Sequence, residues 1–401
     1  MAGGGTDEDG RILCLDHIRG LSVLGILIVN AIAFAQPIEV YNNPALSPVP
    51  LSHADIAWWW LIEVFCREKF VTLFTLLFGI SLYLVGRNSE GEGRVFGTPL
   101  FRRLAWLALF GVIHGALIWN GDILLLYAVT GFLMWRWQTA KADALIGWGL
   151  FLFLVGAAVV LLPAMGLGVD DLPVAADVGP QIDLMRQGFA GSLSGNFLAW
   201  VDSLLGTFCF VPGTLGGMML GLGLFKAGLL RGEGKTGTYV LLILAGAVSL
   251  VAIALQASQE TAGRFQGPEI YGVDQIANTV LCLPVALGYA SLLILAGRTG
   301  VGRVLLHPLA CCGRMAFTNY LTQSLLMTAL CYGGRAPENL AQAWNLPWFG
   351  LVNDAGLVPV VAAIWLGQLT ISTLWLSVFR YGPFEWLWRC LTYNRLVAIT
   401  R

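Results

Sequence analysis

The sequence predicts an all-α polytopic membrane protein, a bundle of about ten transmembrane helices. Of its 401 residues, 57% are hydrophobic and only 12% are charged, so a water-soluble fold of this length could not bury its apolar surface. The mean hydropathy is +0.73, and the apolar residues gather in runs long enough to cross about 30 Å of hydrocarbon. The net charge of −1 creates no strong field for nucleic acid. We therefore expect a lipid bilayer as the environment and no nucleic-acid partner.

Ten apolar runs have about the length of a membrane span. They cover residues 18–36, 69–86, 102–119, 122–137, 143–163, 201–225, 238–256, 275–297, 309–332 and 357–379. Residues 51–68 contain three adjacent tryptophans and predict an interfacial helix before the second run, or a charged collar that reaches back to water. Residues 166–200 are acidic and rich in Gly and Pro, which predicts an external loop. This loop divides the chain into an N-terminal transmembrane half, 1–165, and a C-terminal transmembrane half, 201–401.

Lysine and arginine are unevenly distributed between the loops. If the N-terminus is cytoplasmic, the inner segments hold 18 of the 23 Lys and Arg residues. The positive-inside rule then predicts that both termini are cytoplasmic. The first sixteen residues are polar and lack an apolar core, so no cleavable signal peptide is expected. The eight cysteines show no metal-ligand spacing, so we expect neither a metal site nor disulfides.

An imidazole and a carboxylate lie eight residues apart in the apolar stretch 111–127. The Trp-Asn-Gly sequence at 119–121 predicts a tight turn between them, so two helices would meet there. Ionisable groups inside a membrane are costly, which favours a functional site; the alternative is a hydrogen bond that only orients two helices. Because a carboxylate holds a histidine in one tautomer and so makes it a general base, His114 and Asp122 are the predicted catalytic pair.

Arginines at the starts of the first and third runs could bind an anionic donor. Asp16 and Arg19 open the first run, and Arg102 and Arg103 open the third. Guanidinium groups form charge-assisted hydrogen bonds to phosphate. The three arginines, together with Asp16 beside Arg19, are therefore the predicted donor-binding set. The alternatives are that Asp16 caps its helix and that the arginine pair is ordinary positive-inside charge.

Polar residues also crowd the ninth run, between 313 and 324. Such residues either join helices inside a bilayer or line a substrate pocket, and we keep both interpretations. The predicted acceptor pocket combines this stretch with the charged residues before the second run: Glu63, Lys69, Asn319, Tyr320 and Gln323.

A short amphipathic helix is predicted after the tenth run, on the cytoplasmic side. Gly382-Pro383 ends the tenth run and starts this helix. Glu385 and Arg389 lie one turn apart on it, with two tryptophans beside them. We predict a structural or gating role for these two residues.

Six ordered motifs resemble the YeiB-like bacterial membrane proteins, which share the domain of unknown function numbered 418 (DUF418). The resemblance covers nearly the whole chain. The motifs are Leu15-Asp-x-x-Arg19-Gly with Gly25-Ile and Val29-Asn30, Lys69-Phe-x-x-Leu-Phe-x-Leu-Leu-Phe-Gly79, Arg102-Arg103, Gly111-x-x-His114 with Gly121-Asp122-Ile-Leu, Asn319-Tyr320-x-x-Gln323-Ser324, and Gly382-Pro-x-Glu385-Trp-x-Trp388-Arg389-x-x-Thr392-Tyr393.

That family is similar to the transmembrane acyltransferases, which include the lysosomal heparan glucosaminide N-acetyltransferase. The resemblance implies that an acyl group from cytosolic acyl-CoA or acetyl-CoA reaches an acceptor across the membrane, with a histidine involved. In that relative the histidine lies before the second span. The comparable residue here is His53, whose spacing to the Phe-rich stretch differs, and we predict His114 instead.

The leading hypothesis is therefore acyl transfer from a cytoplasmic acyl-CoA to a small-molecule or glycan acceptor that is extracytoplasmic or embedded in the membrane. The predicted location is the bacterial cytoplasmic (inner) membrane. A small-molecule transporter or exporter is the alternative, because intramembrane charges also mark transport pathways. A membrane factor without turnover is a third hypothesis. An oligomer is compatible with all three.

The charge distribution makes a prediction about topology. Reporter fusions after Pro173 and after Gly234 should lie on opposite sides of the membrane, because the Lys and Arg residues gather in alternate loops. A paired alkaline phosphatase and fluorescent protein readout measures the side of each fusion. If both fusions report the same side, the predicted orientation is wrong.

Overall fold

The computed structural model describes residues 12–91, 98–164, 178–266 and 275–400, and every regular element in them is a helix. This confirms the all-α prediction. The longer helices are α1 (Leu13–Ala35), α3 (His53–Phe65), α4 (Lys69–Gly91), α5 (Thr98–Ile113), α6 (Leu124–Met134), α7 (Ala142–Ala164), α9 (Gly188–Cys209), α10 (Val211–Lys226), α11 (Thr236–Ala262), α12 (Ile276–Arg298), α15 (Ala316–Cys331), α17 (Asp354–Val378) and α18 (Pro383–Tyr393). The shorter ones are α2 (Ile38–Asn42), α8 (Gly179–Arg186), α13 (Gly300–Leu305), α14 (His307–Arg314), α16 (Glu338–Ala343) and the π-helical η2 (His114–Ile118).

The structure does not confirm the predicted number of ten spans. Within the described residues, seven helices are long and apolar enough to cross a membrane, or eight if the bent pair α9 and α10 forms one span. The predicted run 122–137 is a shorter apolar helix. The predicted run 309–332 divides between α14 and α15. Ten complete spans are therefore not confirmed.

The predicted loop 166–200 needs a correction. Its described part is mostly helical, because it holds α8 and the first half of α9; residues 165–177 lie outside the described residues. The predicted run 201–225 starts inside α9 and crosses a 56° bend between α9 and α10. Pro212 lies in the first turn of α10, where a residue without an amide hydrogen is tolerated, so the chain restarts a helix there.

The helix expected before the second span is present as α3. A capping box begins it, since Ser52 and Asp55 each accept a hydrogen bond from the other's backbone amide. Together α3 and α4 form one apolar stretch, His53–Arg87, that counts as a single candidate span. Between the two helices the backbone passes through Glu68, whose φ is +65°.

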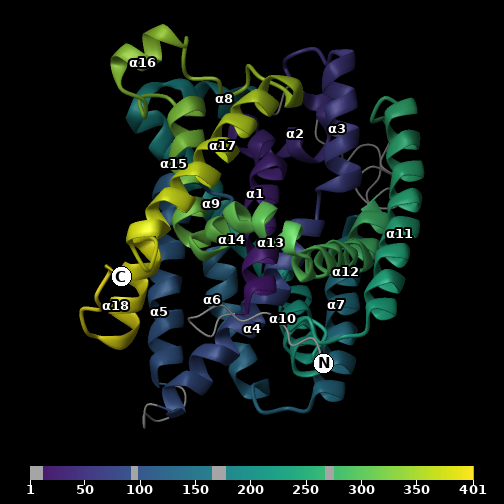
Figure 1. The fold of residues 1–401 in the computed structure, drawn as a ribbon. Coiled ribbons are helices and arrows are strands. Elements are labelled where there is room, and N and C mark those ends of the chain that lie inside the picture. Colours follow the sequence, from purple (N-terminus) through teal and green to yellow (C-terminus); the bar gives the residue numbers. More distant parts are fainter. Residues whose placement is uncertain (1–11, 92–97, 165–177, 267–274, 401) are drawn as a thin grey trace.

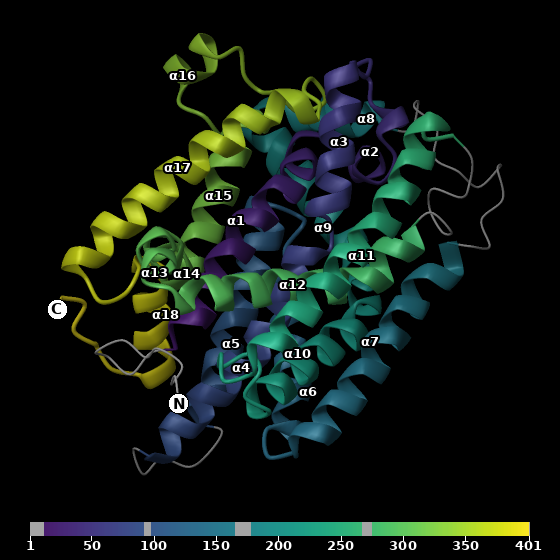
Figure 2. The same ribbon diagram turned by 45° about the vertical axis from the view of Figure 1, so that its right-hand side comes forward.

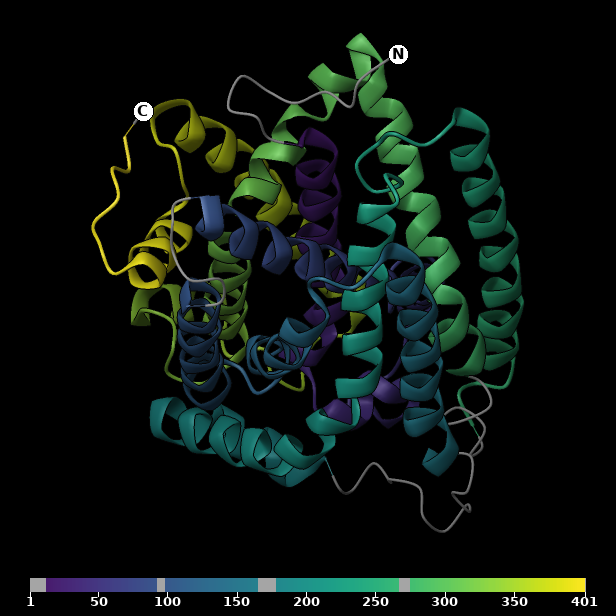
Figure 3. The ribbon, with the colours of Figure 1, turned by 90° about the horizontal axis from the view of Figure 1, so that it is seen from below.

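Helix α1 runs through the middle of the bundle. It packs against α4, α12, α14, α15 and α17, with α17 on one side and α11 on the other (Figures 1 and 2). Helices α2, α8 and α16 lie at the upper end of Figure 1, and α18 lies toward the lower end beside α5. Seen from below, α11 and α18 lie at opposite edges (Figure 3). The two ends of the bundle are therefore built from different elements.

The outer side of α11 shows what surrounds the bundle. Five large apolar side chains at helical spacing are 58–71% exposed along it, namely Leu241, Leu244, Val248, Val251 and Leu255. A continuous exposed apolar stripe of this kind marks a membrane or protein contact. Together with the candidate spans, it indicates a lipid-facing side.

Glycines allow the helices to cross closely. A Cβ atom on Gly79 of α4 would lie 2.2 Å from the Met218 carbonyl oxygen, and one on Gly221 of α10 would lie 2.1 Å from the Leu76 carbonyl oxygen. The hydrophobic effect does not drive helix association within lipid. Small residues at such crossings instead allow the close van der Waals packing that holds two helices together. The α4–α10 crossing therefore depends on two glycines.

Gly79→Ala should destabilise the protein by about 1–3 kcal/mol, because the added methyl group meets backbone atoms that have little room to move. Gly147→Ala is the matched control, since nothing lies within 4 Å of its Cβ position. That change should be neutral or stabilising by up to about 1 kcal/mol. Melting temperatures of both variants in the same detergent test this, and an unchanged value for Gly79→Ala would contradict the close crossing.

Candidate functional site

The predicted His114–Asp122 contact forms in the structure. The two residues meet because α5 and α6 approach closely at Gly111, where a Cβ atom would lie 2.4 Å from the Leu125 amide nitrogen. His114 Nδ1 lies 2.9 Å from Asp122 Oδ1, and each side chain is 1% exposed. Asp122 Oδ2 accepts a hydrogen bond of 2.9 Å from the Leu125 amide at the start of α6. The carboxylate is thus held from two sides.

A serine completes a chain of hydrogen bonds on the other side of the imidazole. His114 Nε2 lies 2.9 Å from Ser324 Oγ of α15, and Ser324 is 1% exposed. In the tautomer that carries its proton on Nδ1, His114 donates to the Asp122 carboxylate, and Nε2 is left to accept a proton from the serine. We call these three residues the Asp122–His114–Ser324 chain. Its order matches that of a general base between a carboxylate and a hydroxyl group.

The backbone around His114 is irregular, and side chains from other helices form hydrogen bonds with its peptide groups. Residues 114–118 form one π-helical turn, a feature that is frequent at functional sites. Asn196 of α9 donates to the carbonyl oxygens of Gly115 (2.9 Å) and Ala116 (3.1 Å) and accepts from the Asn120 amide (2.8 Å). A guanidinium group, that of Arg335, donates to a further carbonyl oxygen of this turn at 2.8 Å. These side chains supply the partners that lipid cannot offer.

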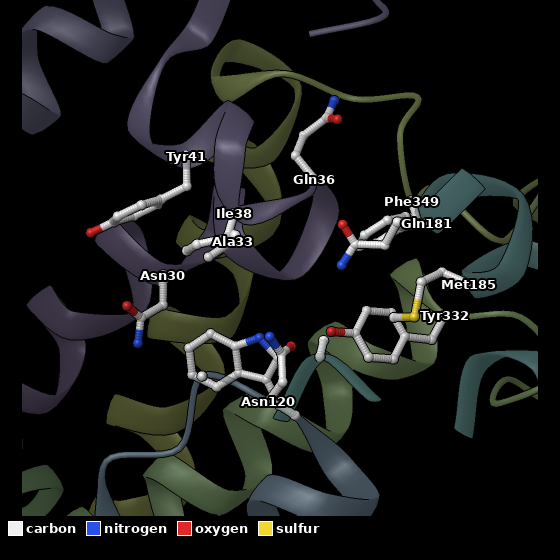
Figure 4. A pocket seen from close by; sticks show the side chains of 13 residues that line it. Asn30, Ala33, Gln36, Ile38, Tyr41, Asn120, Gln181, Met185, Tyr332 and Phe349 are labelled. Atoms are coloured by element: carbon white, nitrogen blue, oxygen red, sulfur yellow. The ribbon is translucent and has the colours of Figure 1, made fainter. Parts of the chain in front are cut away.

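A cavity of about 190 Å³ lies next to the turn that joins His114 and Asp122. Figure 4 shows amide and aromatic side chains around it. Its lining residues are Asn30, Ala33, Gln36, Ile38, Tyr41, Trp119, Asn120, Gly121, Gln181, Met185, Ala199, Tyr332 and Phe349. None of these described residues is charged. The cavity therefore suits a neutral ligand with hydrogen-bonding groups.

One amide in the cavity is only half satisfied. Gln36 is 1% exposed, and its Nε2 donates to the Val352 carbonyl oxygen at 3.1 Å. Its Oε1 is buried without a hydrogen-bond partner among the described residues. A buried acceptor without a partner costs free energy, and this oxygen is itself closed off from a molecule the size of water.

Trp119 separates the cavity from the imidazole. Its indole lines the cavity, stacks on Phe34 with ring centroids 3.9 Å apart and meets the His114 ring edge-on at 6.4 Å. His114 itself is not among the lining residues. The indole therefore lies between this cavity and the predicted base.

Arginines gather around α18. Arg103 lies over the Trp388 ring, with its guanidinium carbon 3.5 Å from the ring centroid, and it is within electrostatic reach of Arg19 and Arg389. Arg102 donates to the Thr392 carbonyl oxygen at 3.3 Å. We call Arg19, Arg102, Arg103 and Arg389 the arginine group.

Most charge of the arginine group has no carboxylate partner. Arg19 pairs with Asp16 at 2.9 Å and also donates to the Ser81 hydroxyl at 3.2 Å. Within the described part of the chain, Arg102, Arg103 and Arg389 form no ion pair. Like charges held together in this way favour an anion.

Comparisons with known proteins identify the family to which the chain belongs. The family model described as "Protein of unknown function (DUF418)" matches residues 224–395. The uncharacterized protein YeiB of Escherichia coli K12 is 34% identical over 397 residues, which cover 95% of this chain and 96% of YeiB. The chain belongs to the YeiB-like DUF418 family. The uncharacterized protein YxaH of Bacillus subtilis 168 is 29% identical over 97% of the chain and 96% of YxaH. Bacterial relatives and several apolar helices make this DUF418 protein a bacterial membrane protein.

The predicted acceptor residues of this DUF418 protein lie outside the cavity. Glu63, Lys69 and Asn278 form a buried network, in which Lys69 Nζ donates to the Glu63 carbonyl oxygen at 2.7 Å and to Asn278. Arg67 donates to Glu63 Oε2 at 3.2 Å. The network joins α3, α4 and α12 and leaves no group of this set facing the cavity.

The polar stretch of α15 divides between two roles. Asn319 donates to Ser372 Oγ at 3.1 Å, and Gln323 donates to Gln368 Oε1 at 2.8 Å, so both residues join α15 to α17. This matches the interpretation that they hold helices together. The Tyr320 ring instead packs against the imidazole of His114, with centroids 5.2 Å apart. Of the three, only Tyr320 lies at the candidate site.

Glu385 and Arg389 of α18 do not pair with each other but contact different parts of the protein. Glu385 accepts hydrogen bonds from the Phe317 amide (2.7 Å) and the Thr318 amide (2.9 Å), so it caps α15. Arg389 lies between the rings of Tyr381 and Tyr393. The structure therefore assigns Glu385 to positioning of α15 and Arg389 to the arginine group.

Sequence reasoning missed two residues of the site. Ser324 belongs to the polar stretch of α15, but nothing local pairs it with an imidazole 210 residues earlier. Asn196 belongs to the segment expected to be a loop. The available signal was an asparagine within a stretch of small and apolar residues, since an amide in such a run needs an internal partner.

Proposed function

We propose that this protein transfers an acyl group from a cytoplasmic acyl-CoA, such as acetyl-CoA, to a small-molecule or glycan acceptor on the extracytoplasmic side. The observation that carries the proposal is the Asp122–His114–Ser324 chain, buried between the arginine group and the polar cavity. In the proposal both termini face the cytoplasm of the bacterial inner membrane, as the distribution of Lys and Arg indicates.

His114 acts as the general base. Its Nε2 takes the proton of the attacking hydroxyl or amine, which makes that group nucleophilic at neutral pH. Asp122 keeps the Nδ1 proton in place at 2.9 Å and stabilises the imidazolium that forms. Burial strengthens both effects, because the surrounding apolar side chains screen charges poorly.

The arginine group binds the phosphates of CoA. Guanidinium groups match phosphate oxygens in geometry and charge, and three of the four arginines have no carboxylate partner within the described residues. Arg103 and His114 lie on the same helix with its π-helical extension, eleven residues apart, which corresponds to about 16 Å at 1.5 Å per residue. The extended pantetheine arm of CoA has the length to carry a thioester from the arginine group to the base.

The cavity receives the acceptor. Its lining combines amides and aromatic rings without charge, and such surfaces bind neutral hydroxylated molecules by hydrogen bonds and by packing on ring faces. These features favour a sugar-like acceptor over a charged one.

His114→Gln should reduce acyl transfer at least a hundredfold, because the amide keeps the volume of the ring but cannot accept and pass on a proton. Asp122→Asn should reduce it less, since it disturbs the tautomer and leaves the base. The readout is release of CoA thiol from acetyl-CoA with methyl glucoside as a probe acceptor, in nanodiscs. His53→Ala, an exposed histidine, is the control.

Full activity of His114→Gln would overturn the role of the base. Loss of activity in the His53→Ala control would point to the histidine before the second span instead. If methyl glucoside crosses liposome membranes that contain the protein and no CoA is released, the protein is a transporter.

Arg103→Gln should weaken CoA binding by about tenfold to a hundredfold, because a charge-assisted hydrogen bond contributes about 1.5–3 kcal/mol. Arg303→Gln, which removes an exposed charge on α13, should bind CoA normally. Calorimetric titration of CoA into both variants at low and moderate salt measures the effect. Equal affinities would contradict the donor site, provided that the melting temperatures agree.

A further inference from the structure

We infer that Ser324 is the nucleophile that carries the acyl group between donor and acceptor, so that transfer passes through an acyl-serine intermediate. The inference rests on the proposed function and adds a covalent step to it. It starts from one contact, the 2.9 Å between Ser324 Oγ and His114 Nε2.

Ser324 differs from the other buried hydroxyls of the bundle. Ser22 and Thr130 donate to the carbonyl oxygen four residues earlier in their own helices at 2.7 Å, which is the usual way for a hydroxyl to be satisfied in a membrane helix. Ser324 Oγ also donates to the carbonyl oxygen four residues earlier, that of Tyr320, at a longer 3.2 Å. Its second and shorter contact is the imidazole at 2.9 Å, and this contact places a base within proton-transfer distance of the hydroxyl group.

The arrangement around Ser324 is that of an activated nucleophile. A serine hydroxyl is weakly nucleophilic until a neighbouring base takes its proton. Here His114 is that base, and Asp122 orients it from the opposite nitrogen. The three residues come from η2, the turn before α6, and α15, so the alignment is produced by helix packing rather than by a local motif.

Position along the bundle also fits this role. Glu385 caps the first turn of α15, and Ser324 lies eight residues after Ala316, about 12 Å further along the helix. Trp388 of the same helix α18 contacts Arg103. Ser324 therefore lies on the side of the imidazole away from Asp122, on the helix whose first turn is fixed by α18, and the inference requires the pantetheine arm to reach it from the arginine group.

Two balanced steps describe the chemistry. Ser324 Oγ attacks the thioester carbonyl carbon and gives its proton to His114 Nε2; the carbon–sulfur bond then breaks, and the CoA sulfur leaves with that proton. In the second step an acceptor oxygen or nitrogen attacks the ester carbon and gives its proton to His114. The bond to Ser324 Oγ breaks, and the serine recovers the proton. No oxidant or further reactant is needed.

Burial protects the intermediate. Ser324 and His114 are each 1% exposed, and the Trp119 indole lies between the imidazole and the polar cavity. An ester in a site that excludes water is hydrolysed slowly. The enzyme would then hold the acyl group until an acceptor arrives from the cavity, and donor and acceptor need not be bound together.

The test needs no acceptor. Purified protein in nanodiscs is mixed with acetyl-CoA labelled in the acetyl group, and intact mass and peptide mapping follow the label. The wild-type chain should release one equivalent of CoA thiol in a burst and carry one acetyl group on the peptide that contains Ser324. Ser324→Ala and His114→Gln should show no burst. Ser22→Ala removes an equally buried hydroxyl and should label normally.

The Ser324→Cys variant distinguishes loss of the nucleophile from loss of folding. It keeps a nucleophile at the same atom position, and its acetyl group should be removed by hydroxylamine at neutral pH, as a thioester is, whereas the serine ester should resist. If Ser324→Ala retains full transfer, or if the label lies on His114, the covalent role is overturned while the proposed acyl transfer stands. If the wild-type chain neither binds nor cleaves acetyl-CoA, the proposed function itself is overturned.

Discussion

The structure depends on one constraint: polar groups inside an apolar bundle need partners within the protein, because lipid offers none. The hydrogen bond between His114 and Asp122 is the clearest case, since both side chains are 1% exposed. It ties the end of α5 to the start of α6, and Asn196 of α9 bonds the π-helical turn between them. The residues that hold this part of the bundle together are therefore the residues that form the candidate site.

The same constraint produces a second buried network with a different character. Lys69, Glu63 and Asn278 bond to one another and to backbone oxygen, and Arg67 also pairs with Glu63 at 3.2 Å. Each of these groups is engaged from several sides, so removal of one would leave a buried charge without a partner. The Asp122–His114–Ser324 chain differs because it ends on a hydroxyl group, which can exchange its proton. The first network is closed on itself, whereas this one ends on a group that the proposed function can use.

The sequence could predict those features whose residues lie close together along the chain. Long apolar runs predicted the helical class, and a turn signal between His114 and Asp122 predicted their contact, because both patterns lie within a few dozen residues. The partnership with Ser324 spans 210 residues, and the cavity draws on segments from Asn30 to Phe349, so neither leaves a local pattern. The count of ten spans is not confirmed, because hydropathy measures apolarity and not helix length or direction. The run 122–137 forms only a shorter apolar helix, and the run 309–332 divides between α14 and α15.

Trp119 lies between the cavity and His114, so the proposed chemistry requires its indole to move. An acceptor in the cavity cannot contact His114 while the indole stacks on Phe34 at 3.9 Å and meets the imidazole edge-on. The indole belongs to the residue directly after the π-helical turn, whose carbonyl groups are bonded by Asn196 and Arg335 rather than only by the helix itself. A turn held by side chains can shift without breaking a regular helix. Movement of this turn would rotate the indole away and open the cavity to the imidazole, so the irregular backbone beside His114 gives the site a way to admit an acceptor and otherwise to exclude water.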